Sequence, residues 1–281
     1  MIDERSVSPE ESDSFSTARL LRSVVPIADY HAHSNYSDGR FLWSMLRAAA
    51  DAGFDAIGVA DHCIVSDREE PRRARSRLGF NLDRTYARRR DAIAAIEGRF
   101  DLDVYDAVEM DYDSRDEDAI ATFLDEAGFD YAIGSVHALE GVNVHLVGYF
   151  ADKTDEEREA LADHYVDELV ALVESELFEV AAHPDLLERN PALRGLLGHD
   201  HYVRLAEAFT RSRTVPEVNA GRVLDDYGDV HPTGAFLTVL VDHGVDVTLG
   251  TDSHAPDELE PRARELQRVV DEYDLDPTRI V

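Results

Sequence analysis

Short motifs of histidine and carboxylate residues recur along this sequence, and their side chains are suited to binding metal ions. His31-Ala32-His33 places two imidazoles two residues apart, so on an extended segment both rings would point to the same side. Comparable motifs follow: Asp61-His62, Glu109-Met110-Asp111, Val136-His137, His183-Pro184-Asp185, Glu217-Val218-Asn219 and Asp252-Ser253-His254. Imidazole nitrogens and carboxylate oxygens together suit Zn, Mn or Fe. A zinc site built from cysteines is excluded, because the chain contains only Cys63.

Each motif comes at the end of an apolar segment rich in Val, Ile and Ala, which is the composition of a strand buried on both faces. The predicted strands are residues 23–29, 55–60, 103–109, 131–136, 178–182, 214–218 and 245–250. Amphipathic segments between them predict helices at residues 42–52, 84–100, 116–127, 155–176, 200–211, 232–243 and 257–273. This alternation of strands and helices predicts an α/β fold, with a parallel sheet closed or nearly closed into one TIM-like barrel. The chain has 281 residues, which is an ordinary length for a single-domain barrel of this kind.

The C-terminal ends of the strands meet at one face of such a barrel, and that face carries the active site. We therefore expect the histidines at the strand ends to converge there with Glu109 and Asp252; they are His31, His33, His62, His137, His183 and His254. His145 follows the fourth strand and could either reach this face or lie apart from it. The other histidines, at positions 164, 199, 201, 231 and 243, are expected to be structural or solvent-facing. Residues 63–83 are rich in arginine and predict a long loop over one end of the barrel.

The chain is strongly acidic. Its 59 Asp and Glu residues against 28 Lys and Arg give a formal net charge of −31, and the acids are spread along the whole sequence. This distribution is typical of adaptation to a salt-rich cytoplasm, and it argues against nucleic acid or an anionic membrane as a partner. The single cysteine fits a reducing, cytoplasmic compartment, and no apolar run is long enough for a membrane-spanning helix. Residues 1–22 predict a flexible acidic tail, which leaves residues 23–281 for the barrel.

The motifs resemble, in type and order, those of the PHP (polymerase and histidinol phosphatase) superfamily over about residues 26–260. They read H-A-H-S-N-Y-S-D-G, A-D-H, V-E-M-D-Y, G-S-V-H, A-H-P-D and G-T-D-S-H. The resemblance implies a distorted (β/α) barrel of seven strands that holds two or three divalent metal ions. It implies a first site of His31, His33, Glu109 and Asp252, a second in which Glu109 bridges to His137 and His183, and a third of Asp38, His62 and His254. Glu109, His137, Asp252 and His254 would take part directly in catalysis.

Within the superfamily, four segments resemble histidinol-phosphate phosphatases: D-Y-A-I-G-S-V-H, E-S-E-L-F-E-V-A-A-H-P-D-L, E-V-N-A-G and V-T-L-G-T-D-S-H. This resemblance implies a phosphomonoesterase for a small phosphate ester, in the first instance L-histidinol phosphate of histidine biosynthesis. Glu217 or Glu140 could contact the amine of that substrate. Two metal ions bridged by a carboxylate would lower the pKa of a bridging water, and the resulting hydroxide would attack the phosphorus. The alternatives are a phosphoesterase that acts on nucleotides or nucleic-acid ends, and a non-catalytic barrel.

Four further residues near the strand ends are candidates for binding phosphate or for supporting the metal ligands. Arg189 and Arg222 follow the fifth and sixth strands, where a guanidinium could bind phosphate bidentately. The other reading of both arginines is that they are ion-paired on the surface. Asp61 and Asp185 could orient ligating histidines from behind. No residue stands out as a general acid.

Overall fold

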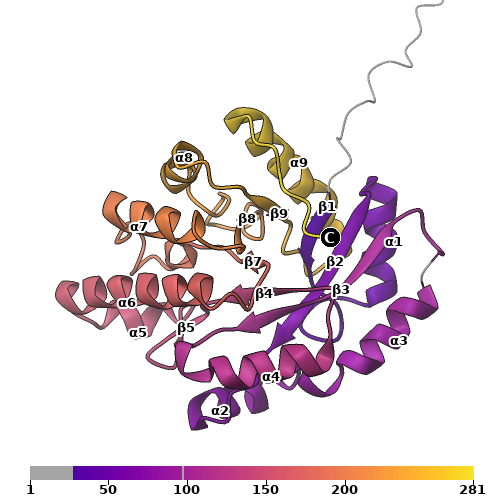
Figure 1. Cartoon of the computed structure of the whole chain (residues 1–281), viewed down its shortest axis with the longest axis horizontal. Coiled ribbons are helices and arrows are strands. Elements are labelled where there is room, and N and C mark those ends of the chain that lie inside the picture. Colours follow the sequence, from indigo (N-terminus) through magenta and orange to yellow (C-terminus); the bar gives the residue numbers. More distant parts are fainter. Residues whose placement is uncertain (1–27, 97) are drawn as a thin grey trace, which may run out of the picture.

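The computed structural model describes residues 28–96 and 98–281, and in this part of the chain a parallel sheet is surrounded by helices (Figure 1). The sheet has seven strands in the order β1-β2-β3-β4-β7-β8-β9. They are β1 (Ala28–Ala32), β2 (Ala56–Cys63), β3 (Asp103–Asp111), β4 (Tyr131–Ser135), β7 (Val180–Ala181), β8 (Val215–Asn219) and β9 (Thr248–Gly250). The predicted single-domain α/β barrel is therefore confirmed.

The sheet closes on itself where β1 meets the end of β9. The main-chain N–H of Asp252 donates to the His31 carbonyl at 2.6 Å, and the N–H of His33 donates to the Ser253 carbonyl at 2.9 Å. Strand lengths are unequal, since β2 and β3 run for 8 and 9 residues while β7 has 2 and β9 has 3. The short strands make one side of the barrel irregular, which is the distortion that the family resemblance implies.

The first strand extends further along the sequence than predicted. β1 includes His31 and ends at Ala32, whereas the predicted strand at residues 23–29 ends before both. Residues 23–27 lie outside the described part of the chain, as does the predicted tail at residues 1–22. The longer C-terminal end places His31 on the strand itself and His33 directly after it, which fixes the direction of the His31 side chain.

Seven helices correspond to those predicted: α1 (Leu42–Ala52), α3 (Tyr86–Ile96), α4 (Glu117–Ala127), α6 (Asp155–Glu174), α7 (His199–Phe209), α8 (Gly234–Asp242) and α9 (Pro256–Tyr273). In α1 the apolar residues at positions 42, 45, 46 and 49 are buried on one face, and Gly53 caps the helix with a φ of 84°. A capping box formed by Thr154 and Glu157 begins α6. No helix in the described ranges is long and apolar enough to cross a membrane.

The predicted loop at residues 63–83 contains a helix, α2 (Glu69–Leu78), so this prediction is wrong. α2 has no buried residue, and it therefore lacks the apolar stripe by which a packed helix is recognised in a sequence. Polar contacts hold it to the barrel instead. One of them joins Nη1 of Arg75 to the carbonyl of Ile64 at 2.9 Å.

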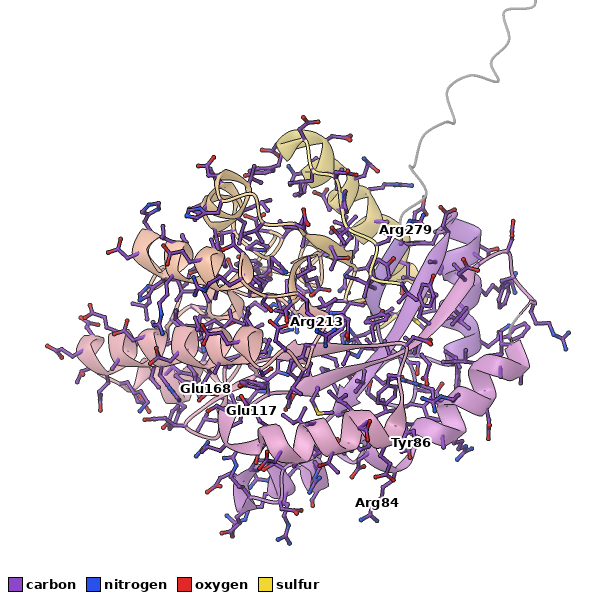
Figure 2. The ribbon with its side chains drawn as sticks, viewed as in Figure 1. Arg84, Tyr86, Glu117, Glu168, Arg213 and Arg279 are labelled. Carbon is purple, nitrogen blue, oxygen red and sulfur yellow. The ribbon has the colours of Figure 1, made fainter. Side chains whose placement is uncertain are left out.

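Smaller elements fill the remaining connections: η1 (Leu82–Arg84), η2 (Ser114–Asp116), the hairpin of β5 (Ala138–Leu139) and β6 (Val142–Asn143), α5 (Val147–Ala151) and η3 (Leu186–Arg189). Arg84 at the end of η1 points away from the ribbon at the edge of the molecule (Figure 2). η3 follows shortly after β7, and it ends at Arg189 on the C-terminal side of the strands.

Candidate metal centre

Side chains from the ends of several strands meet around Glu109, a buried carboxylate near the end of β3. Its Oε2 atom lies 2.8 Å from Nδ1 of His62 and 3.3 Å from Nε2 of His31. Its Oε1 atom lies 3.1 Å from Nε2 of His183 and 3.3 Å from Nε2 of His137. One carboxylate thus faces two separate groups of imidazoles, which is how a bridging ligand is placed.

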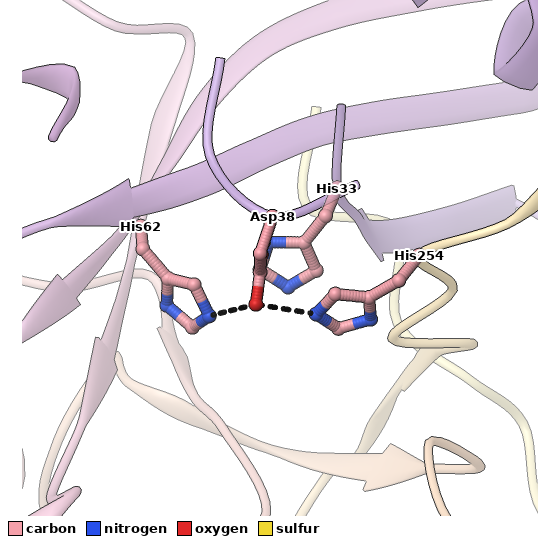
Figure 3. A group of neighbouring side chains, drawn as sticks. All are labelled: His33, Asp38, His62 and His254. Atoms are coloured by element: carbon pink, nitrogen blue, oxygen red, sulfur yellow. Dashed lines mark ion pairs between the residues drawn. The ribbon is translucent and has the colours of Figure 1, made fainter. Parts of the chain in front are cut away.

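Three groups of candidate ligands share this space, and within each group the ligand atoms lie within 4.8 Å of one another. The groups are His31, His33 and Asp252; Glu109, His137 and His183; and His33, Asp38, His62 and His254, the last drawn in Figure 3. In this last group, Oδ2 of Asp38 lies 3.4 Å from Nε2 of His254 and 3.7 Å from Nε2 of His62. The structure therefore brings together all of the side chains that the sequence predicts as ligands.

A fourth group contains an acid that was not among the predicted ligands, Asp111, together with His62 and His137. Oδ1 of Asp111 lies 2.6 Å from Nδ1 of His137. The signal for this residue is present in the sequence. Asp111 stands two residues after Glu109 on the same strand, so both side chains point to one side of the sheet.

The spacing and burial of these atoms fit divalent cations. Ligand atoms about 2.1 Å from an ion at the corners of a tetrahedron lie about 3.4 Å from one another. Nε2 of His31 and Nε2 of His33 lie 3.3 and 3.5 Å from Oε2 of Glu109. Although Nδ1 of His62 lies 2.8 Å away, none of the contacts of this buried oxygen with the described residues has hydrogen-bond geometry. An unpaired buried polar atom costs about 1–3 kcal/mol, and more when it is charged, and a bound cation would remove that cost.

Hydrogen bonds from behind direct several imidazoles toward the centre. Nδ1 of His31 donates to Oε1 of Glu217 at 2.8 Å, and Nδ1 of His254 donates to the carbonyl of Asp252 at 2.9 Å. Each ring then presents Nε2 as its metal-binding atom. Glu217 is only 1% exposed and also accepts a hydrogen bond from the main-chain N–H of His183 at 3.2 Å. It lies beneath the ligands, so the prediction that it contacts a substrate amine is wrong.

Two candidate ligands have a backbone conformation that is rare outside glycine, with φ at 31° for His183 and 50° for Asp252. They follow the two shortest strands of the barrel, β7 and β9. Such conformations cost about 1–3 kcal/mol each and are concentrated at functional sites. Gly250 at the end of β9 is also constrained, because a Cβ atom there would collide with the Glu217 carboxylate and lie 2.7 Å from Cβ of His31.

Charge interactions shift the pKa values of the cluster. Burial alone would raise the pKa of Glu109, but the charges of His62, His31 and His137 hold it well below its usual range. Burial alone would lower the pKa of His137, but Glu109 and Asp111 raise it to about 10. The carboxylates thus attract positive charge strongly, which is the electrostatic character of a cation-binding site.

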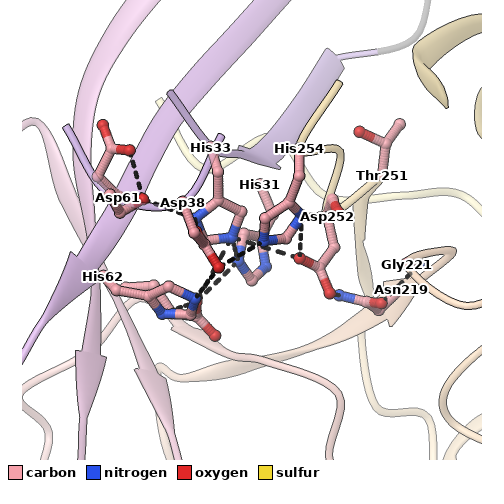
Figure 4. Close-up of polar contacts among 12 residues, drawn as sticks. His31, His33, Asp38, Asp61, His62, Asn219, Gly221, Thr251, Asp252 and His254 are labelled. Carbon is pink, nitrogen blue, oxygen red and sulfur yellow. Dashed lines mark hydrogen bonds and ion pairs between the residues drawn. The ribbon is translucent and has the colours of Figure 1, made fainter. Parts of the chain in front are cut away.

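Two acids predicted to orient ligating histidines have other partners. Asp61 accepts a hydrogen bond from the hydroxyl of Ser37 at 2.6 Å and pairs with the buried guanidinium of Arg89 at 3.0 Å. It lies beside the cluster and holds the loop that follows β1 (Figure 4). Asp185 binds His231 at 2.6 Å, and His231 is not a candidate ligand. Both acids therefore support the site differently from the prediction.

The cluster forms the floor of a pocket of about 190 Å³, which Arg189, Arg222 and His145 also line. Nη2 of Arg189 lies 3.3 Å from Oδ2 of Asp252, and the Arg189 side chain is nearly buried. Arg222 is 41% exposed and pairs with Asp225 at 2.8 Å. His145 is exposed at the mouth of the pocket, and the partial desolvation there together with the positive charge of Arg189 lowers the pKa of its imidazole.

The end of α2 and the residues that follow it form one side of the pocket rim. Leu78 and Phe80 line the pocket, and the Phe80 ring stacks on the His62 ring with their centroids 6.3 Å apart. Glu140, the second acid predicted to meet a substrate amine, is not among the pocket residues. Its carboxylate lies 3.2 Å from the ammonium of Lys153.

Comparisons with known proteins agree with the predicted family. The model of the PHP domain matches residues 29–220, whereas no curated protein sequence is significantly similar to the chain. The fold is similar to that of histidinol phosphate phosphatase from Lactococcus lactis subsp. lactis Il1403, which was solved with zinc, L-histidinol and phosphate. The two structures superimpose with a TM-score of 0.69 and 19% sequence identity, over 90% of this chain and 95% of that one. A putative histidinol phosphatase from Listeria monocytogenes gives a TM-score of 0.68 and 17% identity, over 83% of this chain and 97% of that one. At these identities the two structures establish a shared fold.

Proposed function

The chain belongs to the PHP domain family, and on that premise we propose that it is a metal-dependent phosphomonoesterase for a small phosphate ester. One observation carries the proposal. The Glu109 carboxylate faces imidazoles on both of its oxygens, at the floor of a pocket that Arg189 and Arg222 line. A cation site beside two guanidinium groups suits a phosphate dianion, which must enter a protein whose net charge is −31.

Divalent ions bound here would neutralise phosphate charge and activate water. The residues that would hold them are His31, His33, Asp252 and Glu109 for one ion, Glu109, His137 and His183 for a second, and Asp38, His62 and His254 for a third. Arg189 would bind phosphate oxygens and orient the ester, while the more exposed Arg222 would bind from the outer side of the pocket. His145 also lines the pocket, and its lowered pKa favours the neutral imidazole, whose N–H could donate a hydrogen bond to a phosphate oxygen.

For the substrate we propose L-histidinol phosphate. Four sequence segments that resemble histidinol-phosphate phosphatases support this choice, and so does the shared fold with the Lactococcus lactis enzyme, which was solved with L-histidinol and phosphate. The pocket adds a physical reason. Asp111 lines it, is partly exposed and is not among the residues proposed to hold the ions, so it could neutralise a cationic amine next to the phosphate. The face of the Phe80 ring that is not stacked on His62 could stack on a substrate imidazole.

A nucleotide, or another ester with a second anionic group, is an alternative that one feature favours. A groove of about 530 Å³ adjoins the pocket and shares Phe80 and Asn81 with it. Arg84 and Arg88 line this groove and are exposed, and neither forms an ion pair with a residue of the described ranges. A second phosphate could bind there while the first lies over the metal centre.

The test is a substrate panel on protein loaded with Mn, Zn or Fe in high salt. The panel contains L-histidinol phosphate, AMP, a nucleoside 3′,5′-bisphosphate and an aryl phosphate, and we expect the highest kcat/KM for L-histidinol phosphate. A nucleotide preferred by about tenfold, or about 1.4 kcal/mol in transition-state binding, would replace it. If metal-loaded protein hydrolyses none of the esters, the barrel is non-catalytic. The control is Glu109→Gln, which should lose both bound metal and activity.

The role of Arg222 has a separate test. We expect Arg222→Ala to raise KM for a phosphomonoester by about 10- to 150-fold, the value of a lost charge-assisted contact, with metal content unchanged. Arg204→Ala is the matched control, because Arg204 also pairs with an exposed aspartate, Asp167, at 2.7 Å, but on the outer helix α7. Equal kinetics for the two variants would assign Arg222 to the surface.

A further inference from the structure

We propose that His231, which lies outside the metal-ligand groups, positions Arg189 for phosphate through a hydrogen-bonded chain that begins at Asp185. The inference rests on the proposed function, because it concerns how Arg189 is held at the phosphate position. Sequence patterns place His231 at the edge of a helix as a structural or solvent-facing residue. In the structure it is fully buried, and so is Asp185.

The chain has a defined direction. Nδ1 of His231 lies 2.6 Å from Oδ1 of Asp185, and an ionised carboxylate can only accept, so Nδ1 carries the hydrogen and donates it. Nε2 is then left with a lone pair. Nε of Arg189 lies 2.9 Å away and donates its N–H to that lone pair. The imidazole therefore links the buried acid to the guanidinium in one tautomer.

The His231 ring is held in place on several sides. Its main-chain N–H donates to the Asn219 carbonyl at 2.9 Å, and its carbonyl accepts from the Asn219 N–H at 2.7 Å. The Tyr227 ring stacks on it, with centroids 4.8 Å apart and planes 3° from parallel. Oδ2 of Asp185 accepts from the main-chain N–H of Thr233 at 2.6 Å, which fixes the acid as well. The ring has little freedom to move, so it can define a direction for Arg189.

These contacts fix the plane of the guanidinium. Nε of Arg189 is bound by His231, and Nη2 donates to the Asn219 side chain at 3.1 Å and to Asp252 at 3.3 Å. Nη1 donates no hydrogen bond to any of the described residues, and Arg189 lines the pocket, so the N–H groups of Nη1 remain for a ligand. Asp252 already offsets part of the guanidinium charge at Nη2. A neutral imidazole as the acceptor at Nε adds no second carboxylate, so the chain orients Arg189 without further reducing the positive charge that meets phosphate.

The test measures phosphate binding and catalysis on the full-length, metal-loaded protein. In His231→Gln we expect KM for an aryl phosphate and the Kd for inorganic phosphate, measured by calorimetry, to rise by about tenfold or more, the value of a charged contact put out of position. Metal content and kcat should change much less. The matched control is His201→Gln. His201 also binds an aspartate, Asp163, at 2.8 Å, but it lies on the outer helix α7.

A double-mutant cycle separates positioning from a merely structural role. If His231 acts through Arg189, then adding His231→Gln to Arg189→Met should change KM and Kd by less than about twofold. A full effect in both backgrounds, or none in either, would overturn the inference. If His231→Gln does not fold, Asp185→Asn carries the same test, because it alters the far end of the chain. Wild-type protein that binds no phosphate and hydrolyses no ester would instead contradict the proposed function.

Discussion

Replacing Glu217 with glutamine should weaken metal binding while leaving the pocket lining intact. Glu217 lies under the cluster and accepts three hydrogen bonds, from Nδ1 of His31 at 2.8 Å, from the main-chain N–H of His183 at 3.2 Å and from the Asn219 side chain at 2.9 Å. A glutamine can keep one oxygen for His31. Its amide N–H groups would then face the two remaining donors, so two hydrogen bonds are lost and the charge that supports His31 is removed.

The size of the effect follows from this geometry. Residues that orient metal ligands from behind typically contribute about 10- to 100-fold in metal affinity, which corresponds to about 1.4–2.8 kcal/mol. We expect a value near the upper end, because Glu217 contacts two candidate ligands, His31 through its ring and His183 through its main chain. The loss of affinity should affect the ions that His31 and His183 would hold, rather than the ion that the group containing Asp38 would hold.

The assay is competition for zinc between the protein and a chromophoric chelator, with Glu179→Gln as the control. Glu179 also accepts a main-chain hydrogen bond, from Ala132 at 2.8 Å, but it lies just before β7, at the opposite end of the barrel strands. We expect Glu217→Gln alone to lose affinity. If both variants bind zinc as wild type does, Glu217 does not support the ligands. If Glu217→Gln binds zinc normally but raises KM, the acid contacts substrate after all.

Three further outcomes follow from the structure. Gly250→Ala should destabilise the fold by about 1–3 kcal/mol through overpacking against Glu217 and His31, measured by urea unfolding, whereas Gly148→Ala should not, since a Cβ there meets nothing within 4 Å. Arg89→Met should cost about 3–5 kcal/mol in the same assay, because it leaves the buried Asp61 without its ion pair; a loss below about 1 kcal/mol would show that the pair is dispensable. Raising KCl from about 0.1 to about 1 M shortens the screening length from about 10 to about 3 Å. Because this weakens the repulsion among the acidic residues of a chain with net charge −31, Tm should rise. A flat or falling Tm would contradict the salt adaptation.

The positions of most candidate ligands could be predicted from the sequence because the topology determines them, whereas Asp38 was expected only from the family resemblance. His62, His137 and His183 each come at or just after the end of a different strand, and in a parallel barrel these ends share one face. No knowledge of individual contacts was needed for that step. The helices with a regular apolar stripe were predictable for the same reason, since periodicity reports which face is buried.

The sequence did not predict the direction or the surroundings of a side chain where a contact with another side chain determines them. An acid at a strand end can point toward a substrate or beneath the ligands, and only its packing against His31 places Glu217 underneath. The prediction that His231 is structural or solvent-facing agrees with its burial, but its contacts could not be predicted, because its partners Asp185 and Arg189 are 46 and 42 residues away. The helix α2 was missed since it buries nothing, and its charged sequence has the composition of a loop.

That helix places the entrance of the pocket on a part of the chain that the core does not constrain. Leu78 at the end of α2 and Phe80 just after it line the pocket, although α2 itself contributes no buried side chain. Substitutions along α2 should therefore cost little folding free energy while they reshape what can enter. The histidines below contact one another and Glu109 at short range, so few changes there are tolerated. In evolution, substrate range and metal chemistry can then change at different rates within one chain. Substitutions in α2 can admit new substrates while the residues of the metal centre stay the same.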